Sequence, residues 1–292
     1  MKKSLFLLAL FLPLFTFSEE SVTFYVAADP HVGRFQEIDN EAANRATIED
    51  MNALPGTRAP WNPEETIEKP RGLLITGDLT DGRWRHWIGS FSKYGFCSLF
   101  TAKGNGLLKI PVYEGYGNHD IKREYLGVLI SIYFRNLCRQ TPIHKSRNGL
   151  HYSWDWGGVH FVNLNLYPGG SGESHNSLNF LRYDLKNHLT NPQQPIILYH
   201  HYTYRDSEAW WTLKEREAAY EVMKEFNIIA IFVGHQHKFN HHVWNGIDIY
   251  ALQSTYVGRY ALCHIKDNQL FIALRRRSQW LDILWQKEFF RP

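Results

Sequence analysis

The sequence has few cysteines and no marked excess of charge of either sign. Three cysteines, Cys97, Cys138 and Cys263, are too few for a disulfide framework in 292 residues. Lys and Arg number 32 against 29 Asp and Glu, and 44% of the residues are hydrophobic, which excludes a disordered chain and a polytopic membrane protein. The chain also lacks internal repeats and linkers rich in Pro, Gly or Ser. We therefore expect a single globular domain over residues 19–292.

Residues 1–18 have the pattern of a secretory signal peptide. Two lysines precede an apolar run from Leu5 to Phe17, and Thr16 and Ser18 are small enough for the −3 and −1 positions of a cleavage site. The run is shorter than the roughly 20 residues that span a bilayer, which disfavours the alternative of a retained membrane anchor. We expect export, to the periplasm or as a secreted protein, with no stable membrane span after cleavage near Glu19.

Cleavage at that position leaves almost no net charge. The loss of Lys2 and Lys3 lowers the formal net charge from +3 to +1. A mature chain of this kind has no general basic field to attract phosphate backbones. We therefore expect no nucleic-acid partner, and the sequence leaves the oligomeric state open.

Short β-branched and aromatic runs alternate along the chain with segments of helical character. The runs cover residues 21–29, 71–78, 109–118, 158–166, 195–201 and 227–235, and the helical segments cover residues 37–54, 84–100, 122–138, 178–188 and 210–225. Nearly continuous apolar strands are typical of sheets buried on both faces, and the alternation favours an α/β architecture. Residues 246–276 instead predict antiparallel strands with a turn at residues 266–268.

Polar side chains that can bind metal follow five of these strands. They are Asp29 with His31, Asp78 with Asp81, Asn118 with His119 and Asp120, His200 with His201, and His235 with His237. Ligands of open α/β sheets bind beyond the carboxyl ends of the strands, and strand residues two apart project to the same side. A single histidine is more often structural than a ligand, but five such strand ends favour one common site.

These strand ends offer more donors than a single closed site needs. A structural zinc site takes four ligands, usually with cysteine among them. Here the nitrogen and oxygen donors are Asp29, His31, Asp78, Asn118, one of His200 or His201, His235 and His237. Such a set without a thiolate suits two divalent ions that share a bridging carboxylate and keep positions open for water and substrate.

The motifs DPH, GDLTD, GNHD, a strand-terminal histidine and GHQH, in this order, resemble the five-block signature of the calcineurin-like metallophosphoesterases. The blocks extend from residue 29 to residue 237. The resemblance implies an α/β fold, a four-layer α/β/β/α sandwich with two central mixed β-sheets. The antiparallel tail is then expected to supply the second sheet.

The resemblance also implies which residues bind the metals. Asp29, His31 and His237 would hold the first ion, Asn118, His201 and His235 the second, and Asp78 would bridge the two. The choice of His201 over His200 rests on the likeness of the pair HY to a strand-terminal His-Tyr of the family, and His200 remains the alternative. The ligands accept Mn, Zn, Fe or Co. Asp81 stands where purple acid phosphatases have tyrosine, which argues against a charge-transfer Fe(III) site.

The implied activity is hydrolysis of a small phosphomonoester or phosphodiester. A hydroxide bridging the two divalent ions would attack the phosphorus in line. By resemblance, His119 would lie beside the scissile phosphate and protonate the leaving group, and Asp81 would orient it. The motifs do not distinguish a monoesterase from a diesterase.

Substrate selection is expected to come from residues outside this core. Arg34 and Arg205 are candidates for pairing with a phosphate oxygen, with a plain surface role as the alternative. Trp210 and Trp211 would either form an aromatic wall or pack a helix. The segments that we expect to shape specificity are residues 54–70 with Trp61, 84–87, 168–175 and 202–211.

Two other functional classes are alternatives to an enzyme of this kind. A non-catalytic metal-binding member of the same fold would not need the acid pair His119 and Asp81. A nuclease is disfavoured by the expected export, the small net charge and the lack of a basic groove with interleaved aromatic residues.

Overall fold

The computed structural model describes residues 21–33, 40–81, 83–90, 93–121, 125–205 and 210–289. The expected signal peptide of residues 1–18 and the candidate Arg34 lie outside the described residues. The division into a leader and a single domain therefore stays a prediction. None of the helices in the described part of the chain combines the length and apolar character that a membrane crossing needs.

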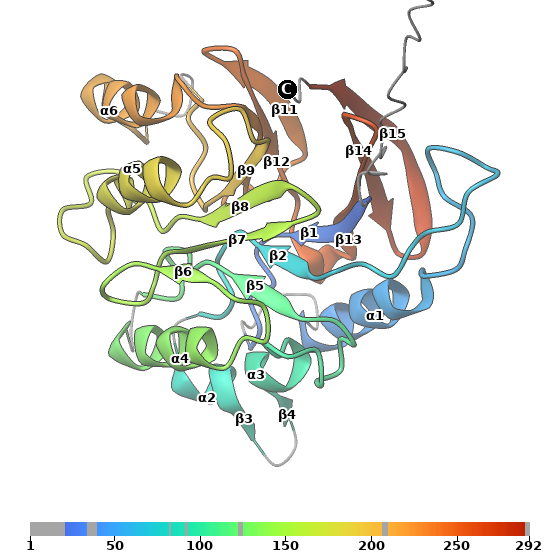
Figure 1. Ribbon diagram of the computed structural model, residues 1–292. Helices are drawn as coiled ribbons and strands as arrows, with labels where there is room; N and C mark the ends of the chain where they lie inside the picture. Colours follow the sequence, from blue (N-terminus) through green and yellow to red (C-terminus); the bar gives the residue numbers. More distant parts are fainter. Residues whose placement is uncertain are drawn as a thin grey trace, which may run out of the picture.

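The first of two large sheets is mixed and combines both ends of the described chain (Figure 1). Its parallel part consists of β1 (Val22–Ala27), β2 (Leu73–Ile75) and β5 (Val112–Glu114). Its antiparallel part consists of β13 (Arg259–Lys266), β14 (Gln269–Arg276) and β15 (Gln279–Glu288). The strand order is β15-β14-β13-β1-β2-β5, so β1 lies between the two parts.

The second sheet is also mixed, in the order β11-β12-β10-β9-β8-β7-β6. The strands β8 (Val159–Asn163), β9 (Ile196–Tyr199), β10 (Ile228–Val233) and β12 (Ile247–Ala251) run parallel. The strands β6 (His144–Lys145), β7 (Tyr152–Trp156) and β11 (Asn240–Trp244) pair antiparallel at the two edges. The tail expected from the sequence therefore divides between the sheets: β12 joins this sheet, whereas β13 and β14 form the antiparallel part of the first.

Three buried apolar clusters separate four layers. Between the sheets, Phe24 packs edge to face on Phe161 at 5.2 Å and on Phe232 at 6.4 Å. Tyr25, the next residue of β1, belongs instead to the cluster on the outer face of the first sheet. This alternation is the two-residue period of a strand buried on both faces. A third cluster covers the outer face of the second sheet.

Helices cover both outer faces (Figure 1). The first sheet is covered by α1 (Asn40–Ala53), α2 (Trp84–Ile88), α3 (Phe96–Leu99) and α4 (Tyr125–Leu137), and the second by α5 (Leu178–Asn187) and α6 (Leu213–Met223). The four-layer α/β/β/α sandwich expected from the sequence is confirmed.

The single helix expected over residues 84–100 is two short helices separated by a small hairpin, β3 (Gly89–Ser90) and β4 (Lys93–Tyr94). Gly89 ends α2 with φ +86°, a conformation that favours glycine. A Cβ on Gly95 would lie 2.1 Å from the Gly89 nitrogen, so the chain reverses tightly here. The two glycines therefore break the helix.

The proline-rich loop of residues 54–70 lies away from the carboxyl ends of the strands. Trp61 stacks on His264 at 4.6 Å, and His264 pairs with Thr23 near the start of β1. Since the metal-binding candidates follow the other end of β1, the expectation that this loop shapes specificity is not supported by its position.

Candidate metal centre

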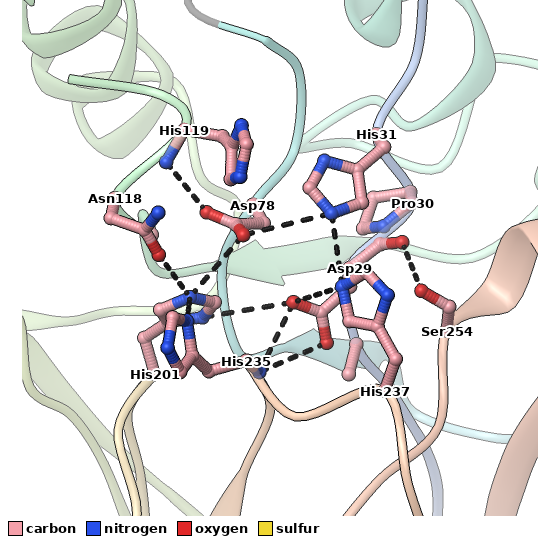
Figure 2. A network of polar contacts seen from close by, with 12 residues as sticks. Asp29, Pro30, His31, Asp78, Asn118, His119, His201, His235, His237 and Ser254 are labelled. Carbon is pink, nitrogen blue, oxygen red and sulfur yellow. Dashed lines mark hydrogen bonds and ion pairs between the residues drawn. The ribbon is translucent and has the colours of Figure 1, made fainter. Parts of the chain in front are cut away.

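The candidate ligands follow strands of both sheets and converge where the carboxyl ends meet (Figure 2). Asp29 and His31 follow β1, Asp78 follows β2, and Asn118 and His119 follow β5 in the first sheet. His201 follows β9, and His235 and His237 follow β10, in the second sheet. The stacking of the sheets thus brings together residues more than two hundred positions apart in the chain.

The first group of donors consists of Asp29, His31, Asp78 and His237, whose ligand atoms all lie within 4.8 Å of one another. The Nε2 atoms of His31 and His237 face each other at 3.1 Å. Nε2 of His31 lies 3.6 Å from Oδ2 of Asp78, and Nε2 of His237 lies 3.6 Å from Oδ1 of Asp29.

The second group consists of Asp78, His201 and His235. Nε2 of His201 lies 3.4 Å from Oδ2 of Asp78 and 3.1 Å from Nδ1 of His235. The amide oxygen of Asn118 lies 3.0 Å from the same nitrogen and adds a further oxygen donor. Asp78 belongs to both groups, as a bridging carboxylate would.

The donor set fits divalent cations. The imidazole nitrogens of His31 and His237, and those of His201 and His235, face each other, and the neighbouring carboxylate oxygens add negative charge. The hydroxyl of Tyr256 lies 3.1 Å from Nδ1 of His237, a contact that can orient this ring with Nε2 turned into the site. The residues thus fit two divalent ions with histidine and carboxylate ligands and without a thiolate.

Burial and charge act against each other in this cluster. Burial raises the pKa of Asp78, but the neighbouring His201 and His31 hold it below its usual range. Burial alone would lower the pKa of His201, whereas the Asp78 carboxylate raises it to about 9. Because imidazole binds a cation only in its neutral form, binding at His201 is coupled to the release of any proton that it carries.

Five of the candidate ligands have a left-handed backbone. The φ angles are +49° at Asp29, +44° at His31, +50° at Asp78, +71° at His235 and +53° at His237. This conformation costs about 1–2 kcal/mol for a residue with a Cβ. Backbone strain of this kind clusters at functional sites, where the surrounding structure holds it in place.

The loop that follows β5 approaches Asp78 very closely. A Cβ on Gly117 would lie 2.1 Å from Oδ1 of Asp78, so only glycine is accommodated at this position. The same oxygen accepts the backbone N–H of His119 at 2.8 Å. The His119 ring lies edge to face with the His31 ring at 4.8 Å, beside the first donor group.

Asp81 has different surroundings from those that the sequence suggested. Asp81 is hydrogen-bonded to His86, and Arg83 lies 3.6 Å from it. Orientation of His119 by Asp81 therefore stays a prediction without a described contact to support it.

Asp120, which sequence reasoning did not assign a role, is fully buried and links the GDLTD and GNHD loops. It accepts the backbone N–H groups of Leu79 at 3.0 Å and of Thr80 and Gly117 at 2.8 Å. Its position in the GNHD motif could have indicated a role near the site, but a sequence motif does not show which way a side chain points.

The structure places His201 in the cluster and His200 outside both donor groups. The His200 ring lies 5.0 Å from the Tyr204 ring, and burial lowers its pKa to about 3. Arg205 is exposed, and its pairing with a phosphate oxygen stays a prediction.

The two neighbouring tryptophans face different surroundings. Trp211 packs on Tyr204 at 5.2 Å, next to the apolar cluster of the second sheet. The Trp210 ring lies 4.7 Å from the ring of the candidate ligand His235. Trp211 therefore packs at the core, and a role of Trp210 as an aromatic wall stays a prediction.

Comparison with known proteins gives one match to a family and several to solved structures. The family model for calcineurin-like phosphoesterase matches residues 22–239. The chain is 25% identical over 141 residues to Purple acid phosphatase 23 of Arabidopsis thaliana, and the match covers 45% of this chain. It covers only 29% of that protein, so the chain spans less than a third of this curated relative.

The structural matches cover most of the chain at low sequence identity. GAP50, described as the anchor in the inner membrane complex of Plasmodium, matches with a TM-score of 0.61 and 9% identity over 92% of this chain and 88% of its own. The protein TT1561 of Thermus thermophilus matches with a TM-score of 0.49 and 11% identity over 83% and 94% of the two chains. At 9% identity, the likeness to GAP50 shows a shared fold alone.

Proposed function

Since the chain belongs to the calcineurin-like phosphoesterase family, we propose that it is an exported, metal-dependent hydrolase of small phosphomonoesters or phosphodiesters. The observation that carries the proposal is the position of Asp78, which is shared by two groups of donors. A single shared carboxylate between two sets of histidines is the arrangement that a pair of neighbouring divalent ions needs.

The roles proposed for the ligands follow from this arrangement. Asp29, His31 and His237 would hold one ion, and Asn118, His201 and His235 the other. Bound there, two divalent ions would polarise the phosphoryl oxygens and lower the pKa of a water molecule to near neutrality. Because most of these side chains are buried, the protein holds their orientation before substrate binds.

His119 is the proposed general acid. Its backbone N–H donates to Asp78, and its ring lies 4.8 Å from that of His31, beside the first donor group. An imidazole at this position can donate a proton to the leaving alkoxide oxygen. This donation would matter most for esters whose alcohol is a poor leaving group.

Export is proposed on the sequence of residues 1–18 alone. Its test is the intact mass of the chain recovered outside the cytoplasm. A mature chain that begins near Glu19 supports cleavage, whereas a full-length chain in the membrane fraction favours the retained anchor.

Hydrolysis is tested with a matched pair of aryl esters, one monoester and one diester with the same leaving group. The protein is first treated with a chelator and then assayed with Mn²⁺, Zn²⁺, Fe²⁺ or Co²⁺. Turnover of either ester that depends on the added ion supports the proposal, and the ratio of the two rates indicates the preferred class. A folded protein that binds the ions without turnover of either ester would instead favour the non-catalytic alternative.

A further inference from the structure

We propose that Trp210 and Tyr202 form a stacking wall for a planar ring in the alcohol part of the substrate, a nucleobase or an aryl group. The inference rests on the proposed function and narrows its substrate class. We call this pair of side chains the aromatic wall.

The aromatic wall adjoins the second group of metal-binding candidates. The Tyr202 ring lies 4.3 Å from the ring of His235, tilted by 43°. The Trp210 ring lies 4.7 Å from His235, nearly perpendicular at 83°, and 5.7 Å from Tyr202. Any substrate whose phosphoryl group lies beside His235 therefore has aromatic surface next to it.

Trp210 is exposed to solvent although it lies beside a candidate metal ligand. Its side chain is 43% exposed, although Trp211 beside it packs on Tyr204 and near the core. Large exposed apolar side chains also occur elsewhere, on α4 for example, but the ring of Trp210 lies against that of a candidate ligand. An exposed ring at the edge of a polar site is typical of a surface that a ligand covers.

Tyr202, the second residue of the aromatic wall, is held by contacts with neighbouring rings. Tyr202 is 8% exposed, and its ring packs edge to face on Tyr167 at 5.3 Å. Tyr167 in turn contacts the ring of His175 at 5.2 Å. Tyr202 therefore offers a surface that needs little ordering when a ligand binds.

The aromatic wall lies where we expect it to contact the alcohol part of a phosphoester. The phosphoryl group is the part that cations hold, so the alcohol is the part that extends past His235. Stacking of a base on an aromatic side chain is worth about 5- to 150-fold in affinity. A phosphoester with a planar ring would thus be preferred by about this factor over one with the same phosphate and sugar but no ring.

The test compares adenosine 5′-monophosphate with ribose 5-phosphate, which differ by the base alone. Binding is measured by calorimetry on the metal-loaded His119→Ala variant, so that affinity is determined without depending on turnover, and kcat/KM is measured on the wild-type protein. We expect tighter binding and a higher kcat/KM for the nucleotide, by about 5- to 150-fold.

Substitutions locate the preference. Trp210→Ala is expected to remove most of the preference, by weakening nucleotide binding while the affinity for ribose 5-phosphate stays unchanged. Trp210→Phe is expected to retain more of the preference. Tyr133→Ala is the matched control, because Tyr133 is an aromatic residue that is 41% exposed and its ring lies 5.7 Å from that of Phe134, on α4 of the first sheet's outer face. This control is expected to keep the full preference.

Equal affinities for the two compounds, or an equal loss for both in Trp210→Ala, would overturn the inference. Ribose 5-phosphate turnover would then still support the proposed function. Conversely, absence of turnover with any ester would contradict the proposed function, while the calorimetric comparison would still decide whether the wall binds a ring.

Discussion

Oδ2 of Asp78 lies 3.4 Å from Nε2 of His201, although the two residues follow strands of different sheets (Figure 2). Asp78 follows β2 of the first sheet and His201 follows β9 of the second. The candidate site therefore exists only when the sheets are stacked. Cations bound between these residues would link the two halves of the sandwich.

The first prediction is that divalent ions stabilise the fold. An ion that binds only the folded chain adds about 2.7 kcal/mol to the free energy of unfolding at a concentration about one hundred times its Kd. We expect added Mn²⁺ or Zn²⁺ to raise Tm by several degrees in differential scanning fluorimetry, and a chelator to reverse the change. Asp78→Asn should lose the effect, and an equal shift in this variant would show that the ions bind elsewhere.

The second prediction concerns His119 as the proton donor. His119→Ala is expected to lower kcat by about 10²- to 10⁴-fold on an alkyl phosphate, because the alkoxide then leaves without a proton. The loss should be much smaller on 4-nitrophenyl phosphate, whose leaving group is already acidic. Metal content, measured in parallel by mass spectrometry, should stay at the wild-type level. An equal loss on both esters would remove the acid role.

The third prediction separates Asp120 from Asp81. In the wild-type protein, both carboxylate oxygens of Asp120 accept backbone N–H groups. Asp120→Asn replaces one of these oxygens with an NH₂ group, which cannot accept. A buried N–H donor that loses its acceptor costs about 1–3 kcal/mol. We expect a loss of at least about 2 kcal/mol in the free energy of unfolding, measured with urea in the presence of a chelator.

Asp81→Asn is the comparison for this experiment. Its carboxylate is partly exposed and has His86 as its hydrogen-bonded partner, so we expect a loss of about 1 kcal/mol or less. If Asp81→Asn instead lowers kcat with the same leaving-group dependence as His119→Ala, Asp81 orients His119 as the sequence suggested.

The fourth prediction is a pH dependence that arises far from the metal centre. His160 is buried, with Nδ1 at 3.0 Å from Asp155 and Nε2 at 2.8 Å from Asp184. Burial lowers its pKa, but hydrogen bonds and charge from the two carboxylates raise it to about 9. Because the pKa of His160 in the folded chain lies above its unfolded value of about 6.5, the charged ring stabilises the fold. This contribution is fully present below about pH 6.5 and is lost as the pH rises toward 9.

The size of this contribution is up to about 3 kcal/mol. The free energy of unfolding of the wild-type protein should therefore fall between about pH 6.5 and 9 relative to that of His160→Gln. The measurement is urea denaturation at several pH values with metal removed. Parallel curves for the two proteins would contradict a charged His160 in the folded state.

The sequence predicted the layers and the location of the site because both depend on local patterns. Each strand core is a short apolar run, and its period places residues such as Phe24 and Tyr25 on opposite faces. The metal-binding candidates follow directly after these runs, where the backbone leaves the sheet. The motif Asp29-Pro30-His31 could therefore be placed at a strand end before its neighbours in space were known.

Strand partners and side-chain directions could not be predicted in the same way. The tail divides between the sheets because β12 finds a parallel partner in β10 whereas β13 pairs with β1, and both choices depend on residues distant in the sequence. His200 and His201 are adjacent and chemically identical, so only the turn after β9 decides which one faces Asp78. Nor does the sequence show that Asp120 turns toward the backbone of residues 79–80 whereas Asp81 turns toward His86.

The most direct test of the account is the number of divalent ions that the chelator-treated protein binds per chain, measured by titration calorimetry with Zn²⁺ or Mn²⁺. We predict two ions for the wild-type chain, one for His237→Ala and none at the same affinity for Asp78→Asn. A folded wild-type chain that binds no ion, or an Asp78→Asn variant that binds as many ions as the wild type, would contradict a metal centre built around Asp78.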